Sequence, residues 1–258
     1  MGLLEGKVAL VAGVANKRSI AWGIARAFDR EGAALILPYQ IERFKENLDK
    51  LLPELSQPPM TIQLDVTDDV SLANLANALK ERYDALHILV HSVAHAKTED
   101  MSRRFFQTSR DGYHFAQDVS SYSLTALTQA LHPQLVAAGR ASVITMTHEG
   151  AVRAMPNYNV MGVAKAALEA TVRYLALDLG SEGIRVNAIS AGPVKTLAAS
   201  GVKGISTALS ATRDRAPIPE NITTEDVGNA AVFLASPWST HITGSVIYVD
   251  SGSHIVGY

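Results

Sequence analysis

Seven short apolar segments, separated by segments of helical character, place the strongest constraint on how this chain can fold. Each apolar segment is rich in Val, Ile, Leu and Ala and is bounded by residues that favour turns or begin a helix. Continuous apolar runs of this kind are typical of parallel strands buried on both faces of a sheet. We predict strands at residues 7–13, 34–39, 61–66, 87–91, 142–146, 184–189 and 245–249. We predict helices at residues 19–31, 41–52, 68–82, 118–137, 157–179 and 224–235.

The alternation of strands and helices predicts the fold class. Parallel strands need crossover connections, and these are right-handed in nearly all known βαβ units. We therefore expect an α/β protein with a seven-stranded parallel sheet and helices on both faces, the doubly wound Rossmann fold. No linker-like composition, internal repeat or low-complexity tract divides the sequence, so residues 1–258 are expected to form a single dinucleotide-binding domain.

The composition excludes several other classes of protein. The 258 residues are 47% hydrophobic, carry a net charge of −2 and contain no long Lys/Arg run, which argues against disorder and nucleic-acid binding. The sequence has no Cys, and although His91 and His95 are spaced like metal ligands, no third ligand accompanies them, so no metal is expected. Without a signal peptide or a membrane-length apolar run, the chain is expected to be cytoplasmic and free of the membrane.

The turn after the first predicted strand has features of a dinucleotide site. Gly13 ends the strand and Ser19 can begin the next helix, whose free N–H groups and dipole favour a pyrophosphate. The full G-x-G-x-x-G pattern is absent, so an ordinary strand-to-helix turn explains these residues equally well. Asp65 and Val66 end the third strand, where the Asp can accept from an adenine amino group, and an Asp that begins a turn explains this residue equally well. Gln40 follows the second strand with neither an acid nor an adjacent Arg, which leaves NAD and NADP undecided.

Tyr158 and Lys165 form the sharper chemical signal. Seven residues is close to two helical turns, so the two side chains would face the same way, about 10 Å apart along the helix axis. A lysine cation near a phenol favours the phenolate and strengthens the phenol as a donor. The same lysine can hold the ribose hydroxyls of a nicotinamide cofactor. An ordinary helix with a Tyr and a Lys on one face meets the same spacing, so the spacing alone does not identify a catalytic pair.

Together these motifs resemble the NADH-dependent enoyl-acyl-carrier-protein reductases, divergent short-chain dehydrogenase/reductases of bacterial fatty acid synthesis. The resemblance covers the whole chain and rests on Tyr158-x6-Lys165 and on the runs 156–165 and 185–201. It implies hydride transfer from nicotinamide C4 to the β carbon of a trans-2-enoyl thioester. Tyr158 would donate to the thioester oxygen and Lys165 would bind the nicotinamide ribose. The cofactor would be NADH, with NADPH less favoured. The implied cofactor-binding residues are Gly13, Ser19, Ile20, Gln40, Asp65, Val66, Ser92, Val93, Lys165, Val194 and Thr196.

The resemblance also implies a substrate side and partners. Residues 195–220, rich in Ala, Ser, Thr and Gly, match the family's substrate-binding lid. The partner would be an acyl-carrier-protein thioester, and the family forms homotetramers. A reductase of a different activated enone or carbonyl in secondary metabolism and a weakly active NADH-binding isozyme are the alternatives. The residues expected on the substrate side are His95, His148, Met161 and Leu197.

His148 is the largest departure from the family, which usually has a second Tyr ten residues before the catalytic one. A histidine titrates near pH 6.5, and Glu149 beside it would raise that pKa. We therefore predict that the substrate KM changes between about pH 6 and 8. A commonly aromatic position is here His95, and lid positions that are basic in some members are Ser206 and Thr207. The cofactor side thus matches the family better than the substrate side.

Overall fold

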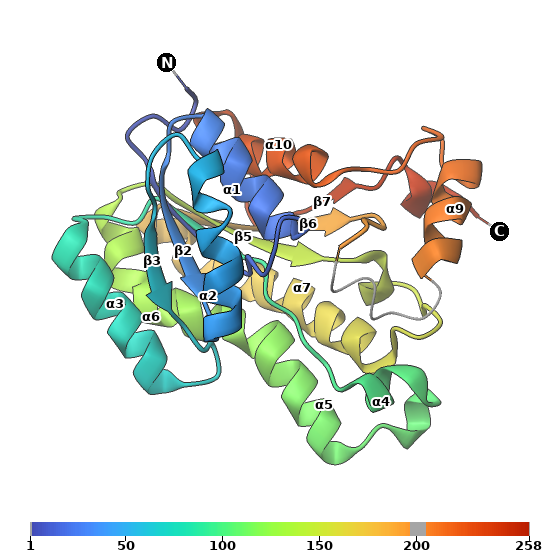
Figure 1. The fold of residues 1–258 in the computed structure, drawn as a ribbon. Coiled ribbons are helices and arrows are strands. Elements are labelled where there is room, and N and C mark those ends of the chain that lie inside the picture. The colour runs from blue at the N-terminus through green and yellow to red at the C-terminus, as the bar shows by residue number, and fades with distance from the viewer. Residues whose placement is uncertain (1, 197–204, 258) are drawn as a thin grey trace.

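The computed structural model describes residues 2–196 and 205–257 and has a parallel sheet at its centre (Figure 1). Within these residues, seven strands lie in the order β3-β2-β1-β4-β5-β6-β7, and every neighbouring pair is parallel. The predicted fold class is therefore confirmed. The strands are β1 (Val8–Ala12), β2 (Ala34–Tyr39), β3 (Met60–Gln63), β4 (Ile88–His91), β5 (Ala141–Thr147), β6 (Ile184–Ala191) and β7 (Val246–Val249).

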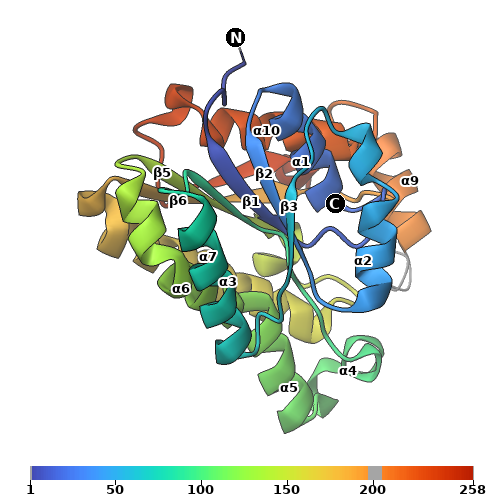
Figure 2. The same ribbon diagram turned by 60° about the vertical axis from the view of Figure 1, so that its left-hand side comes forward.

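Helices cover both faces of this sheet, as Figure 2 shows. Helices α1, α2 and α10 supply apolar side chains to one face, and α3, α6 and α7 supply them to the other. No helix within the described residues is long and apolar enough to cross a membrane. The helices are α1 (Ile20–Arg30), α2 (Glu42–Asp49), α3 (Asp69–Arg82), α4 (Thr98–Ser102), α5 (Arg110–Gln117), α6 (Ser123–Ala137), α7 (Asn159–Leu179), α9 (Ile205–Arg215) and α10 (Thr224–Ala235).

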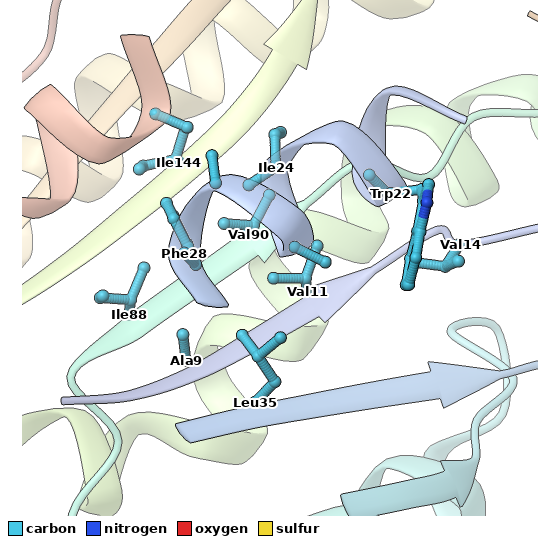
Figure 3. Packing of buried hydrophobic residues seen from close by; sticks show 14 of the residues in the cluster. Ala9, Val11, Val14, Trp22, Ile24, Phe28, Leu35, Ile88, Val90 and Ile144 are labelled. Carbon is cyan, nitrogen blue, oxygen red and sulfur yellow. The ribbon is translucent and has the colours of Figure 1, made fainter. Parts of the chain in front are cut away.

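Alternation along each strand divides the apolar residues between two cores. Side chains of successive strand residues point to opposite faces, so Ala9 and Val11 join the core under α1 while Leu10 joins the core under α6 and α7. Figure 3 shows Trp22 and Phe28 of α1 in the first core, close to the strands. Both aromatic side chains are almost fully buried. A strand with two buried faces explains why the sequence shows continuous apolar runs instead of alternation.

Several predicted boundaries are wrong: the helix expected at 41–52 ends at Asp49, and the strand expected at 61–66 ends at Gln63, before Asp65 and Val66. The helix expected at 118–137 begins earlier, with α5, and a π turn at Asp118–Tyr122 separates α5 from α6. In this turn the Ser120 hydroxyl accepts from the His95 backbone N–H at 2.9 Å and donates to the His95 carbonyl at 3.0 Å. These two bonds tie the π turn to the segment after β4. The helix expected from residue 157 begins instead at Asn159.

The strand order identifies where a ligand binds in this kind of sheet. From β1 the chain builds outward to β2 and β3, and from β4 it builds in the opposite direction. The crevice at such a reversal, beyond the carboxyl ends of the strands, is the usual ligand site of doubly wound folds. The segments that follow β1, β4, β5 and β6 all begin at this edge.

Candidate active site

Gly13 brings the turn after β1 against the segment after β4. Its φ of 109° lies in the region that favours glycine, and a Cβ at this position would lie 2.1 Å from the Ser92 carbonyl oxygen. The Ser92 N–H donates to the Ala12 carbonyl at 3.1 Å, which ties the two strand ends together. Val93 follows and packs against the core under α6 and α7. The structure thus brings Gly13, Ser92 and Val93, three of the expected cofactor-binding residues, to one place.

Ser19 shapes the turn without capping α1 through its side chain. Its hydroxyl accepts from the backbone N–H groups of Ala15 and Asn16, each at 3.1 Å, and makes no cap bond to the helix. Among the described residues, none accepts from the N–H groups of Ile20 and Ala21. Free N–H groups at the first turn of a helix bind anions well, and here they fit a cofactor pyrophosphate.

Gln40 and Asp65 meet beyond β2 and β3. The Gln40 side-chain amide donates to Asp65 at 3.3 Å, and Thr67 donates to the same carboxylate from its backbone at 2.9 Å and from its hydroxyl at 2.7 Å. Burial alone would raise the pKa of Asp65, but these hydrogen bonds hold it below its ordinary value. Asp65 is therefore an ionised acceptor. The Val66 side chain lies in the core, so only its backbone is available to a ligand.

Val194 and Thr196 follow the end of β6. Both side chains are buried, and the Thr196 N–H donates to the Val194 carbonyl at 2.7 Å. This compact turn lies at the same edge of the sheet as the segments after β1 and β4. Leu197, also expected at the site, lies outside the described residues.

Tyr158 occupies the N-cap position of α7 and not its first turns. The residues on each side, Asn157 and Asn159, have positive φ angles of 62° and 31°, a region that Asn tolerates better than most residues. The Asn159 side-chain amide donates to the carbonyls of Met101 and Arg103 at 2.9 and 2.5 Å. The picture of two residues stacked along one helix face is thus corrected: an irregular, anchored turn holds Tyr158.

Lys165 is buried between α7 and the end of β5. Its ammonium donates to the Met146 carbonyl at 2.7 Å, and the side chain is only 5% exposed. Glu169 lies one turn further on and accepts from the Thr147 hydroxyl at 2.7 Å. Burial lowers the pKa of Lys165 to about 8, although the charge of Glu169 opposes the shift.

The Tyr158 phenol is protonated at neutral pH. Burial raises the pKa of Tyr158 above its ordinary value, and no compensating effect of Lys165 accompanies that rise. The expectation that Lys165 would favour a phenolate is therefore wrong, because the ammonium is directed to a carbonyl of β5. A protonated phenol is the form that can donate a hydrogen bond to a substrate oxygen.

His148 lies directly against Tyr158. The two ring centroids are 4.8 Å apart, with planes inclined at 44°, and the Gly150 N–H donates to His148 Nδ1 at 3.0 Å. Burial, with a smaller contribution from the Lys165 charge, lowers the pKa of His148 to about 4. The predicted upward shift is wrong, because Glu149 pairs with Arg153 at 2.9 Å instead. We therefore no longer expect His148 to titrate between pH 6 and 8.

The other two residues expected on the substrate side differ in burial. Met161 is 6% exposed and belongs to a small apolar cluster on which Tyr158 also packs. His95 is exposed, and its ring meets Phe115 edge-on at a centroid distance of 5.6 Å. Met161 is thus adjacent to Tyr158, whereas His95 lies where the segment after β4 reaches α5.

His91 and Gly150 are two residues of the site whose contacts the sequence did not reveal. His91 Nδ1 and Nε2 lie 2.8 Å from the hydroxyls of Thr145 and Ser123. Burial, and to a smaller extent the Lys165 charge, lowers the pKa of His91 to about 3, so the imidazole is neutral. The available signal in the sequence was a histidine at the end of an otherwise apolar strand. Nothing in the sequence marks Gly150 as a residue of the site. In the structure, a Cβ at this position would lie 2.4 Å from Cδ1 of Tyr158.

A doubly wound parallel sheet, an anion-binding turn after β1 and a Tyr–Lys pair at the same edge define a dinucleotide-binding reductase of the short-chain dehydrogenase type. Residues 13–254 match the family described as Enoyl-(Acyl carrier protein) reductase. The chain belongs to this family.

Relatives of the chain agree in name and in structure. Enoyl-acyl-carrier-protein reductase (NADH) FabI of Aquifex aeolicus is 47% identical, over 100% of this chain and 94% of its own. The protein of the same name in Bacillus cereus is 46% identical over 100% of both chains. A crystal structure of the Bacillus cereus enoyl-acyl carrier protein reductase with NADP+ and indole naphthyridinone superposes with a TM-score of 0.97, at 45% identity, over 100% of both chains.

Proposed function

We propose that this protein reduces the trans-2 double bond of an enoyl thioester on acyl carrier protein, with NADH as reductant, in fatty acid synthesis. The observation that carries the proposal is the placement of protonated Tyr158 and buried Lys165 at the edge of the sheet where the free N–H groups of α1 also lie. The full-length identity to enoyl-acyl-carrier-protein reductases supports this substrate class.

The residues present fit a bound dinucleotide. The N–H groups of Ile20 and Ala21 would hold the pyrophosphate, and ionised Asp65 would accept from the adenine. Gln40 presents an uncharged amide and Glu42 an anion, which favours NADH over a 2′-phosphate, and Arg43 is the nearby cation that would bind such a phosphate. Val66, Ser92, Val93, Val194 and Thr196 complete the proposed cofactor site. When bound, NADH supplies the hydride that reaches the β carbon of the substrate.

Tyr158 acts on the substrate, and Lys165 binds the cofactor. The Tyr158 hydroxyl donates to the thioester carbonyl oxygen and stabilises the negative charge that develops there as the enolate forms. Because burial keeps the phenol protonated, this donor is present throughout the neutral pH range. Lys165 binds the ribose hydroxyls, and the Met146 carbonyl holds its ammonium in position.

The same proposal covers the lid and the partners. Residues 195–220 would cover the acyl chain; in the described part, the Ile218 N–H donates to the Ser251 carbonyl at 3.1 Å and joins this segment to the loop after β7. Met161 and His95 would line the substrate side. The chain would act as a single domain, assemble as a homotetramer and receive its substrate from acyl carrier protein.

NADH oxidation tests the proposal directly. Purified protein is given crotonyl thioesters of acyl carrier protein and of coenzyme A, and a 3-oxoacyl thioester as the competing substrate class. We expect turnover of the enoyl thioesters, and we expect Tyr158→Phe to lower kcat by about tenfold or more while the NADH Kd stays within about twofold. Turnover of the 3-oxoacyl thioester alone would overturn the assigned reaction.

A further inference from the structure

The His148 imidazole has a defined proton position. Its Nδ1 accepts from the Gly150 N–H, so the lone pair of that nitrogen is already used and the proton of the neutral ring sits on Nε2. Among the residues that the structure describes, none accepts a hydrogen bond from Nε2. Within residues 2–196 and 205–257, His148 therefore carries a ring N–H donor that no protein group uses, and its ring contacts Tyr158.

The surroundings of His148 keep this donor uncharged. The charged groups around it are Lys165, whose cation disfavours a second positive charge, and Glu149, which Arg153 neutralises by a pair at 2.9 Å. Tyr158, the other titratable neighbour, is a neutral phenol. No described carboxylate hydrogen-bonds to the ring, so nothing in this environment stabilises an imidazolium.

The ring is also held in one orientation. Its backbone follows directly from β5, whose last residues pair with β6, and the Gly150 bond closes a tight turn around the imidazole. Tyr158 packs against the ring at a centroid distance of 4.8 Å. A rotation of the ring would break the Gly150 bond and the contact with Tyr158 together, so Nε2 keeps a constant direction.

We propose that His148 is a second hydrogen-bond donor to the substrate. Its Nε2–H and the Tyr158 hydroxyl together hold the carbonyl oxygen of the enoyl thioester. This inference rests on the proposed function, because it takes the substrate oxygen to lie at Tyr158. Two neutral donors stabilise the enolate oxygen without adding a charge next to Lys165. The role goes beyond packing, since an apolar ring of similar size would fill the same space without a proton to donate.

A comparison of His148→Phe with His148→Tyr tests the effect of the hydrogen-bond donor separately from the effect of the aromatic ring. We expect His148→Phe to lower kcat for crotonyl thioester by about tenfold to a hundredfold, because the donor is lost while Tyr158 remains. His148→Tyr keeps a ring and restores a donor, so we expect it to recover most of that loss. The NADH Kd, from fluorescence titration, should stay within about twofold for both variants. His241→Phe, at an exposed histidine before β7, serves as the matched control for the substitution itself.

Recovery of kcat in His148→Tyr is the readout that a packing role would not give, and a pH profile tests whether the donor is neutral. Between pH 5.5 and 7.5, we expect the pH profile of kcat/KM to have the same shape for the wild type and for His148→Tyr, because neither side chain ionises in this range. Equal kcat values for the Phe variant and the wild type, or for the Phe and Tyr variants, would overturn the inference. Thermal unfolding shows whether each variant is folded, and if His148→Phe is not, His148→Gln repeats the comparison. A wild type without activity on any enoyl thioester would instead overturn the proposed function, and this inference with it.

Discussion

We expect protonated Lys165 to lower the free energy of unfolding at neutral pH, and we expect this effect to disappear at high pH. Burial lowers its pKa from 10.5 to about 8 in the folded chain. At 1.36 kcal/mol per pKa unit, a protonated Lys165 costs the native state about 3 kcal/mol of stability. Below pH 8 both states hold the proton and the whole cost is present. Between pH 8 and 10.5 the unfolded state binds more protons than the native state, so stability rises with pH.

The substitution Lys165→Met isolates this effect. Methionine has a similar length and no charge, and its loss of the hydrogen bond to the Met146 carbonyl adds a cost of about 1–3 kcal/mol that does not depend on pH. We expect the free energy of unfolding of the wild type, minus that of Lys165→Met, to increase by about 2–3 kcal/mol from pH 7 to pH 10. The pH dependence, and not the absolute difference, carries the information.

Urea unfolding of the cofactor-free protein at pH 7, 8, 9 and 10 measures this difference, with linear extrapolation to water. Lys50→Met, which removes an exposed cation, corrects for the general effect of losing one lysine. A difference that stays constant over the pH range, or that falls, would show that Lys165 is not buried as a destabilised cation.

Two further predictions concern the surroundings of the site. Gly150→Ala places a Cβ 2.4 Å from Cδ1 of Tyr158, so we expect a tenfold or greater loss of kcat, about 1.4 kcal/mol or more in barrier, in steady-state assays. Gly180→Ala, where a Cβ meets nothing within 4 Å, is the control; equal effects of the two substitutions would contradict the packing argument. Gln40→Arg should shift the ratio of NADPH to NADH affinity by about tenfold toward NADPH in fluorescence titration, because a guanidinium binds phosphate. An unchanged ratio would show that Gln40, beside Asp65, does not face the ribose.

Much of the fold could be predicted from the sequence because it depends on the local pattern of apolar residues. A strand buried on both faces must be apolar at nearly every position, and α/β crossovers need helices between strands, so the alternation predicted the sheet and its covering helices. Gly13 was legible for a similar reason, since a turn that ends a strand in the left-handed region needs glycine. Tyr158 and Lys165 were selected by their spacing together with the family resemblance, although the spacing suggested that both lie within one helix, whereas Tyr158 caps α7.

The chemical state of the site was decided by tertiary structure. A pKa depends on burial and on charges brought near by distant segments, and the sequence shows neither. Glu149 adjoins His148 in the chain and predicted a raised pKa, but Arg153 takes that carboxylate while burial and Lys165 lower the pKa. Tyr158 likewise keeps its proton because burial disfavours the phenolate, whereas the lysine seven residues away predicted the opposite effect. The sequence alone predicted which residues come to this edge of the sheet, whereas tertiary packing determined their protonation states.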